Sequence, residues 1–177
     1  MTETLTTAQM NSPVGELVIV ASDAGLRAIL WPSERDGRVT FAEPTAKGEH
    51  PIIEQTISQL EEYLTGERKD FDLPLDLVGT DFQKEVWTGL ATIPYGETQS
   101  YGELANELNK PGAARAVGAA TGRNPISIVV PCHRLVGSSG KLTGFAGGIE
   151  TKRWLLDHES PERAMFESSS AGYKINE

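Results

Sequence analysis

The 177-residue chain changes character near Gly79. Ahead of this glycine, "GELVIVAS" and "LRAILW" are rich in strand-forming residues and are joined through Asp23-Ala24-Gly25, which predicts a β-hairpin. Apolar residues at helical spacing then predict a helix over residues 52–64 that ends at Gly66. Because "FDLPLDLVGT" is typical of an extended connector, we expect an α/β domain over residues 1–79.

The second half is predicted to be mostly helical, beginning with an apolar stripe from Phe82 to Leu90. In "SYGELANELNK", Ser100 and Glu103 have capping-box spacing, and Pro111-Gly112 separates this helix from the next, "AARAVGAATG". Two helices joined by a short glycine-containing turn form a helix-turn-helix pattern. We expect this domain to span residues 80–159, followed by a mobile polar tail over 160–177.

The helix predicted after Pro111-Gly112 is almost without long side chains, and Arg115 is its one long projection. Two interpretations stay open. Small residues allow close packing against a neighbouring helix, and they also allow a smooth helix to enter a narrow DNA groove.

The net charge of −9 argues at first against a nucleic-acid partner. The charge is unevenly distributed, however, because residues 1–79 carry 14 acidic and 6 basic side chains while residues 80–158 carry 7 and 8. The second half can therefore meet DNA, and we expect Arg115, Arg123 and Lys152 to contact it in a salt-sensitive way.

Cys132 is the only cysteine, so an intrachain disulfide, a four-cysteine zinc site and a Cys-x-x-Cys redox pair are excluded. No apolar run reaches the ~20 residues that span a bilayer, and "MTETLTTAQM" lacks the apolar region of a signal peptide. We expect a cytoplasmic protein that holds no metal.

The cysteine lies beside a histidine in "NPISIVVPCHRL". A free thiol is only about 3% ionised at pH 7, so a nucleophilic cysteine needs a base or a positive neighbour. His133 can contact Cys132 only if the strand ends there, which Pro131 favours, and Asp157 or Glu159 could orient the imidazole. A buried structural cysteine beside a structural histidine is the alternative.

Three stretches, "IPYGETQSYGELA", "RAVGAATGRNPISIVVPCHRL" and "GFAGGIETKRWLLDHE", strongly resemble the O6-alkylguanine-DNA alkyltransferases over residues 80–159. The resemblance implies a ribonuclease-H-like α/β domain followed by a mostly helical, winged-helix-like domain that carries the reactive cysteine. It implies base flipping in double-stranded DNA and single-turnover transfer of an alkyl group from O6 of guanine to Cys132. Alkyl range and repair of O4-alkylthymine stay open. A monomer without cofactor, metal or membrane is implied.

The resemblance also implies residue roles. Cys132 is the acceptor, His133 is a base acting through a bound water, and Glu159 orients His133. Asn124 braces the turn before the cysteine, and Tyr101 helps to rotate the nucleotide and donates to N3 of guanine. Arg115 fills the space that the flipped base leaves. The remaining implied contacts are with DNA, from Ala114, Ala116, Gly118, Arg123 and Tyr101, and with the base, from Val130, Leu135, Phe145 and Ala146.

The sequence departs from the family pattern at Phe145, where a tyrosine is common, so an aromatic wall stays and a hydroxyl is lost. Two other functions compete with alkyl transfer. Alkyltransferase-like proteins bind the same lesion but lack the acceptor cysteine, which Cys132 contradicts. A cysteine hydrolase would turn over, and it leaves Arg115 on a smooth helix unexplained.

Overall fold

The computed structural model describes residues 3–32, 34, 37–39, 46–47, 49–160 and 174–175. The chain forms two compact units, Met1–Gly79 with Pro125–Val129, and Thr80–Asn124 with Val130–Glu177. The units therefore part at Gly79, and Pro125–Val129 belongs to the first unit although it lies within the span predicted for the second domain.

The first unit contains a four-stranded sheet in the order β3-β2-β1-β4. Its strands are β1 (Leu5–Met10), β2 (Leu17–Ser22), β3 (Leu26–Leu30) and β4 (Ala46–Lys47). β1, β2 and β3 pair antiparallel, which confirms the predicted hairpin, and β4 pairs parallel to β1. Gly25 is required at the turn, because a Cβ there would lie 2.6 Å from the carbonyl oxygen of Pro74.

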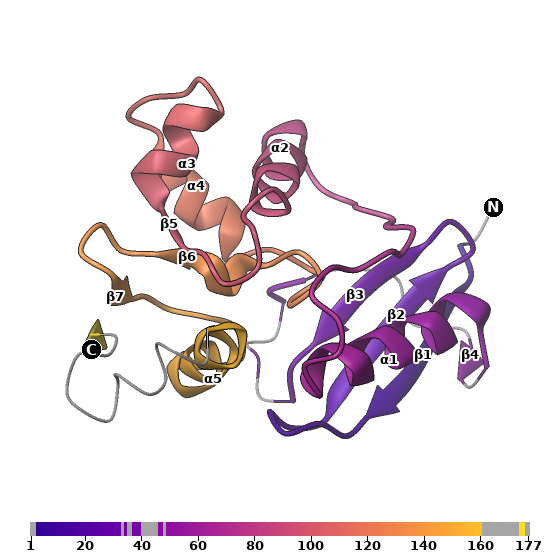
Figure 1. Cartoon of the computed structure of the whole chain (residues 1–177). Helices are drawn as coiled ribbons and strands as arrows, with labels where there is room; N and C mark the ends of the chain where they lie inside the picture. The colour runs from indigo at the N-terminus through magenta and orange to yellow at the C-terminus, as the bar shows by residue number, and fades with distance from the viewer. Residues whose placement is uncertain are drawn as a thin grey trace. The chain divides into compact units, whose positions relative to one another are not determined.

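Helix α1 (Pro51–Leu64) lies across one face of this sheet (Figure 1) and confirms the predicted helix. Its buried residues Ile53, Leu60 and Tyr63 recur at helical spacing and face the sheet side of the unit. The Nδ1 atom of His50 caps the helix by accepting from the backbone N–H of Ile52 at 3.1 Å. Tertiary packing and a side-chain cap together fix where α1 begins and how it lies.

Three charged side chains and one serine form the Arg27 cluster (Glu3, Ser22, Arg27 and Asp76), which links the hairpin to the connector. Arg27 donates to Asp76 Oδ2 from Nε at 3.2 Å and from Nη2 at 2.8 Å, and it also pairs with Glu3. The Ser22 hydroxyl donates to the same carboxylate oxygen at 2.6 Å. Each charge in this cluster therefore has an opposite charge beside it.

The segment Pro125–Val129 is held within the first unit by β3 and the residue that follows it. The N–H of Ile29 donates to Pro125 O at 2.9 Å, and Trp31 Nε1 donates to Ser127 Oγ at 3.0 Å. Ile128 has φ of 74°, and the N–H of Val129 donates to Ser127 O at 2.9 Å, which together form a γ-turn of the rare positive-φ kind. A β-branched residue in this conformation is strained, so its surroundings must hold it.

The second unit is mostly helical. Its helices are α2 (Asp81–Leu90), α3 (Tyr101–Glu107), α4 (Ala114–Thr121), the 3₁₀ turn η1 (Cys132–Arg134) and α5 (Ile149–Glu159). Its short strands are β5 (Gln99–Ser100), β6 (Leu135–Val136), β7 (Lys141–Leu142) and β8 (Lys174–Ile175). β5 pairs parallel to β6, and β7 pairs parallel to β8. Of the predicted tail, only Ser160 and β8 lie within the described residues.

The helices α2, α3 and α4 pack side by side (Figure 1). The predicted capping box starts α3, since Ser100 Oγ accepts from the N–H of Glu103 and Glu103 Oε1 accepts from the N–H of Ser100, both at 3.1 Å. Trp87 Nε1 of α2 donates to Ala120 O of α4 at 2.8 Å. The helix-turn-helix prediction is confirmed by α3 and α4.

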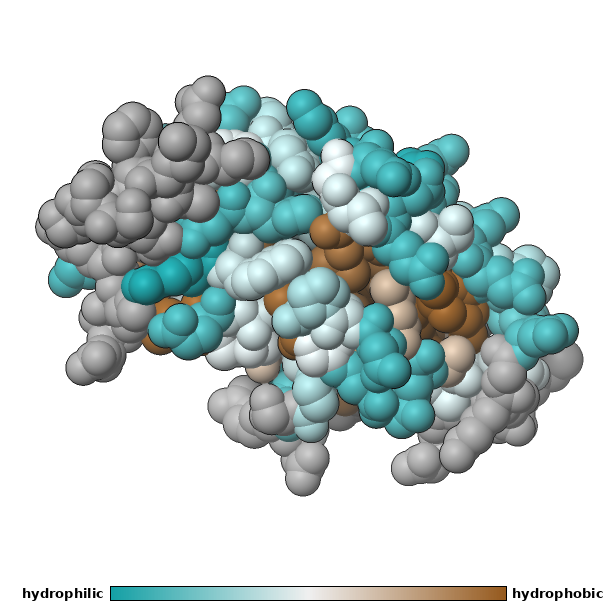
Figure 2. All heavy atoms as spheres, turned by 60° about the horizontal axis from the view of Figure 1, so that its bottom comes forward, coloured by the Kyte–Doolittle hydropathy of each residue, from teal (hydrophilic) through white to brown (hydrophobic). Residues whose placement is uncertain are grey.

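Polar residues dominate the face of the molecule shown in Figure 2, where they separate smaller apolar areas. Within the part of the chain that the structure describes, no helix combines the length and apolarity needed to cross a membrane. Among the residues that the structure describes, the large apolar side chains are mostly interior, and only Leu75 and Val78 of the connector are notably exposed.

Candidate active site and DNA-binding helix

Cys132 begins η1 and its side chain is buried, with 6% of the residue surface exposed. Pro131 has φ of −80° and ψ of 64°, and the N–H of Cys132 donates to Val130 O at 2.8 Å, which makes an inverse γ-turn. The chain therefore turns at Pro131 and continues as a 3₁₀ turn, but the strand expected to end there is not formed, because Ile126 makes only an isolated bridge with Ile29. Because successive residues of a 3₁₀ helix are about 120° apart, Cys132 and His133 are not forced onto opposite faces.

His133, Arg134 and Glu159 form a buried charged group, the Glu159 cluster. His133 Nε2 lies 2.7 Å from Glu159 Oε2, so of the two carboxylates considered from the sequence it is Glu159, on α5, that contacts the imidazole. Arg134 donates to Glu159 Oε1 from Nε at 2.7 Å and to Oε2 from Nη2 at 3.0 Å. Its Nη1 donates to Ile93 O at 2.6 Å. Glu159 is thus fixed by two partners, one of which the sequence reasoning missed.

Burial and charge decide the protonation states of this cluster. Burial lowers the pKa of His133, and this outweighs the opposing effect of Glu159. Burial alone would raise the pKa of Glu159, but His133 and Arg134 hold it well below its usual range. A neutral imidazole that donates from Nε2 to a carboxylate has Nδ1 as a proton acceptor, and this buried Nδ1 has no hydrogen-bond partner in the described part of the chain.

A second polar group, the Thr143 group (Tyr101, Thr143 and Lys152), interacts electrostatically with the thiol. Lys152 of α5 is only 1% exposed, and its Nζ donates to Leu135 O at 2.6 Å and to Thr143 Oγ1 at 3.3 Å. The same Thr143 oxygen is hydrogen-bonded to the hydroxyl of Tyr101. The expectation that Lys152 contacts DNA is wrong, because Lys152 lies on the buried face of α5 and its side chain does not reach the surface.

The electrostatics of the Thr143 group point back to the cysteine. Burial lowers the pKa of Lys152 to about 8, and Cys132 acts in the opposite direction. Burial also raises the pKa of Tyr101, with a lowering by Thr143 and a further raising by Cys132. An ammonium near a thiol favours the thiolate, and Lys152 is a buried cation whose pKa Cys132 acts to raise.

Asn124 lies immediately before the Pro125–Val129 segment and is buried. Its Nδ2 donates to Val130 O at 2.9 Å, and Val130 lies immediately after that segment. The predicted brace residue therefore closes the two ends of the segment that leads to Cys132.

Helix α4 has two different faces. Val117 and Ala120 are buried, whereas Arg115, Ala116 and Ala119 are exposed. Ala114 and Gly118 are half-buried, and a Cβ on Gly118 would lie 3.6 Å from the ring of Tyr101. The close-packing interpretation is confirmed for one face, and the other face presents small residues around one arginine, so entry of that face into a DNA groove stays a prediction. Arg123, two residues beyond α4, is also exposed.

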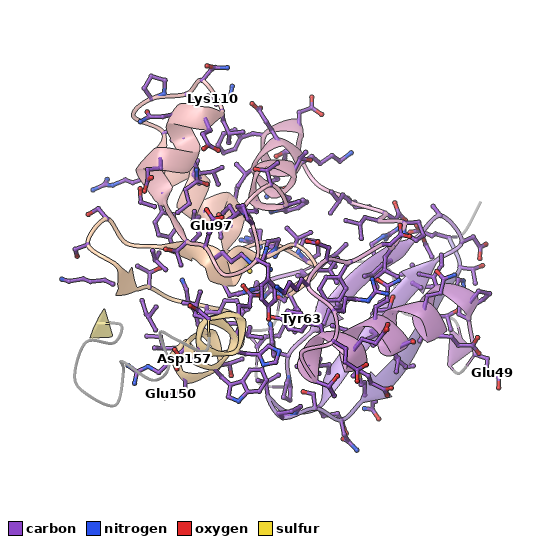
Figure 3. All side chains as sticks on the ribbon, in the orientation of Figure 1. Glu49, Tyr63, Glu97, Lys110, Glu150 and Asp157 are labelled. Carbon is purple, nitrogen blue, oxygen red and sulfur yellow. The ribbon has the colours of Figure 1, made fainter. Side chains whose placement is uncertain are left out.

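The four residues expected to hold the base divide into two pairs. Val130 and Leu135 are buried and flank η1, and the Leu135 carbonyl already accepts from Lys152. Phe145 and Ala146 are half-buried in the loop between β7 and α5. In Figure 3, Glu150 and Asp157 mark the α5 helix that follows this loop.

A surface cavity of about 210 Å³ lies elsewhere, at the connection from α2 to α3 that carries Glu97 (Figure 3). It is lined by Thr92, Ile93, Pro94, Glu97, Thr98, Gln99, Glu103 and Glu107. None of the residues predicted for the site lines it. Among the described residues, no group of three or more His, Cys, Asp or Glu side chains is arranged to hold a metal ion.

Arg134 and Thr143 were not predicted as functional residues, and Lys152 was predicted as a DNA contact and not as a neighbour of the cysteine. A signal for Lys152 exists, because Lys152, Leu155, Leu156 and Glu159 recur at helical spacing on one buried stripe. Arg134 and Thr143 carry no such local signal.

Family models match both parts of the chain. The 6-O-methylguanine DNA methyltransferase ribonuclease-like domain matches residues 5–77, and the 6-O-methylguanine DNA methyltransferase DNA binding domain matches residues 81–161. The predicted two-part fold class is confirmed by these matches.

Two curated relatives are both named methylated-DNA–protein-cysteine methyltransferase. The protein of Mycobacterium tuberculosis strain H37Rv is 62% identical over 103 residues, which cover 58% of this chain and 62% of the relative, less than two thirds of its length. The protein of Mycobacterium leprae is 46% identical over 153 residues, covering 85% of this chain and 89% of the relative.

Among solved structures, Mycobacterium tuberculosis OGT in complex with DNA matches with a TM-score of 0.78 and 44% identity. The match covers 89% of this chain and 92% of that chain. Sequence and structure comparisons thus agree on one family.

Proposed function

The chain belongs to the methylated-DNA–protein-cysteine methyltransferase family, and we propose that it repairs duplex DNA by direct reversal, moving an alkyl group from O6 of guanine onto Cys132. The observation that carries this proposal is the hydrogen bond between His133 and Glu159. It leaves His133, next to the only thiol, with a buried acceptor nitrogen, Nδ1, that has no hydrogen-bond partner among the described residues.

The thiol is activated from two sides. His133 Nδ1 takes the thiol proton through a bound water, and Glu159 stabilises the imidazolium that results. The Lys152 ammonium stabilises the thiolate. Arg134 keeps Glu159 ionised and in place, so the imidazole has one fixed orientation.

The thiolate then displaces guanine from the alkyl carbon. An S–C bond forms as the C–O6 bond breaks, and the electron pair stays on guanine, which takes a proton at N3 from the Tyr101 hydroxyl. The product is a thioether with no acyl bond for water to cleave, and Cys132 is the only cysteine. Each molecule therefore reacts once.

The reacting carbon lies on a base edge within the stack, so the nucleotide must be flipped out. The exposed face of α4 enters the minor groove, with Ala114, Ala116 and Gly118 allowing close approach and Arg115 filling the gap in the duplex. Arg123 contacts a phosphate, which makes binding salt-sensitive. Asn124 holds the turn before Cys132, and Val130, Leu135, Phe145 and Ala146 enclose the flipped base.

The protein acts as a monomer without metal or cofactor, through domains over residues 1–79 and 80–159. A cytoplasmic location suits this chemistry, since a reducing compartment keeps an acceptor thiol free.

Intact-mass spectrometry after mixing with a duplex that carries one O6-methylguanine tests the proposal. We expect a gain of one methylene, mapped to Cys132, that stops at one equivalent and is absent from Cys132→Ala. An unchanged mass together with lesion-selective binding would instead support the alternative, a lesion-binding protein that transfers nothing.

A further inference from the structure

We propose that Trp87 is a positioning residue for DNA, because its indole anchors the C-terminal end of α4 and so holds the orientation in which that helix presents Arg115 to the duplex. The inference rests on the proposed alkyl transfer and adds to it a buried residue of α2. Trp87 is 2% exposed, and its Nε1 donates to the carbonyl oxygen of Ala120 at 2.8 Å.

Helix α4 has little to hold itself in place. Helices α2 and α3 each begin with a capping box, whereas the N-cap residue of α4, Ala113, makes no side-chain cap hydrogen bond. Helix α4 has eight residues, and isolated helices shorter than ~12 residues are marginal in water. Gly118 in its interior weakens it further, since glycine loses the most conformational freedom on folding. The orientation of α4 therefore depends on the helices that pack against it.

The Trp87 hydrogen bond acts at the end of α4 where backbone acceptors are left over. The last four carbonyl groups of a helix have no partner within it, and Ala120 is one of the last four residues of α4. The N–H of Arg123 also donates to this oxygen, at 3.1 Å. An indole N–H can only donate, and a buried one without an acceptor is costly, so the bond favours one placement of α4 against Trp87.

Trp87 is itself fixed well enough to serve as an anchor. Helix α2 begins with a capping box in which Thr80 and Gln83 exchange hydrogen bonds of 2.9 and 3.1 Å. Val86 and Leu90 of the same helix are fully buried. Helices α2 and α4 pack against each other (Figure 1), so the indole links a locally stabilised helix to one that is not.

The anchor and the DNA-facing arginine lie on different faces of α4. Arg115 precedes Ala120 by five residues, which corresponds to about 140° around a helix and about 7.5 Å along it. Ala120 is buried and Arg115 is exposed, so a tilt of α4 at Ala120 displaces Arg115. Cys132, His133 and Glu159 all lie outside α4. Loss of the anchor should therefore impair work on the duplex and spare the chemistry of the thiol.

The test compares methyl transfer to the full chain from two donors, a duplex with one O6-methylguanine and the free nucleoside O6-methyl-2′-deoxyguanosine, each followed as the rate of mass gain. The nucleoside needs no flipping, so it reports on the thiol and the base pocket alone. We expect Trp87→Phe to slow transfer from the duplex about 10-fold, within the range that a misplacement of about 1 Å can cost. Transfer from the nucleoside should stay within about twofold of the wild-type rate.

The matched control is Thr56→Val in the first unit, which removes another hydrogen bond of a buried side chain, from Thr56 Oγ1 to Ile52 O at 2.7 Å. It should change transfer from either donor less than about twofold. A double-mutant cycle with Arg115→Ala gives a second readout. Because Trp87 acts through the orientation of Arg115, Trp87→Phe should slow duplex transfer less in the Arg115→Ala protein than in the wild type.

The two donors separate a positioning residue from a merely structural one. Equal slowing with both donors would make Trp87 a structural residue and overturn the proposal, and so would an unchanged duplex rate. Additive effects of Trp87→Phe and Arg115→Ala would overturn it too, because the two residues would then act independently. A wild type that gains no methylene from either donor overturns the alkyl transfer itself, so the two failures are distinguishable.

Discussion

The two units each contain a buried charged arginine group, and the two groups differ in how completely their charges are matched. In the Arg27 cluster every charge faces an opposite one, and its Glu3 side chain is 44% exposed to solvent. In the Glu159 cluster the carboxylate is 1% exposed, and Nδ1 of the partner imidazole accepts no hydrogen bond from any residue that the structure describes. Within the described ranges, the Lys152 ammonium donates to uncharged oxygens alone, those of Leu135 and Thr143. Burial of charge alone therefore does not mark a site, whereas unused hydrogen-bonding capacity beside a nucleophile does.

The largest effect should come from Glu159→Gln, which removes the one negative charge of its cluster. We expect a loss of about 3 kcal/mol in the free energy of unfolding, because a buried arginine is left uncompensated. The methyl-transfer rate should fall about 100-fold, since the imidazole loses its orienting carboxylate. Denaturant titration and single-turnover kinetics measure the two effects.

Asp157→Asn is the matched control for that change, because it alters a carboxylate on the same helix that does not bond His133. It should change the transfer rate less than about twofold. Equal losses in both variants would contradict the assignment of Glu159 as the orienting group.

The next largest effect should come from Lys152, the buried ammonium whose hydrogen-bond acceptors are uncharged. Lys152→Met replaces a buried ammonium with an apolar chain of similar length, so we expect unfolding free energy to stay level or to rise by about 1 kcal/mol. Transfer should nevertheless slow about 10-fold, because the thiolate loses the nearby positive charge that favours it. A variant that is strongly destabilised would show that Lys152 is a structural residue like Arg27.

The pH dependence of stability tests the same residue. The pKa of Lys152 is lowered to about 8 in the folded chain, from 10.5, so between these values the unfolded state binds more protons than the folded state. Stability from this group must then rise with pH across that window, by about 1 kcal/mol per unit. The difference between wild type and Lys152→Met, measured by denaturant titration from pH 7 to 10.5, should show this rise; a flat difference contradicts the lowered pKa.

In the first unit, Asp76→Asn should cost about 1 kcal/mol, because Arg27 keeps Glu3 and the pair is partly open to solvent. It should leave methyl transfer unchanged. Thermal denaturation gives the first result and the mass assay the second. A loss as large as that of Glu159→Gln would remove the distinction between the two clusters.

The smallest effect should be at the exposed ion pair of Lys110, which is labelled in Figure 3, with Glu85. Its Nζ and Oε1 atoms are 3.7 Å apart. Lys110→Ala should change the free energy of unfolding by less than about 0.5 kcal/mol, because solvent screens the pair. A larger loss in a denaturant titration would mean that exposed pairs also stabilise this fold.

Local patterns in the sequence predicted the elements that are stabilised locally. The capping box at Ser100 and Glu103 and the hairpin turn at Gly25 depend on neighbours in the chain, and both are present. β1 was missed because "LTTAQM" is largely polar, and it becomes a strand by pairing with β2 and β4.

The same limit applies to the candidate site. Cys132, His133 and Glu159 carry a recognisable motif, whereas Thr143 joins Tyr101 and Lys152 only through the folded arrangement of a loop and two helices. Lys152 was predicted to be a surface contact with DNA because only its positive charge was considered. It is buried because it lies on the face of α5 that packs into the interior.

The Pro125–Val129 segment makes the first domain discontinuous in sequence. A fragment cut at Gly79 would leave this segment on the wrong piece, separated from Ile29 and Trp31. We expect the fragment of residues 80–177 to expose Ile126 and Ile128. We expect the fragment of residues 1–79 to recover its ordered structure when the fragment of residues 80–177 is added back. A chimera between relatives should accordingly exchange residues 1–79 and 125–129 together. The unit that can be exchanged between relatives therefore consists of two separate stretches of the sequence.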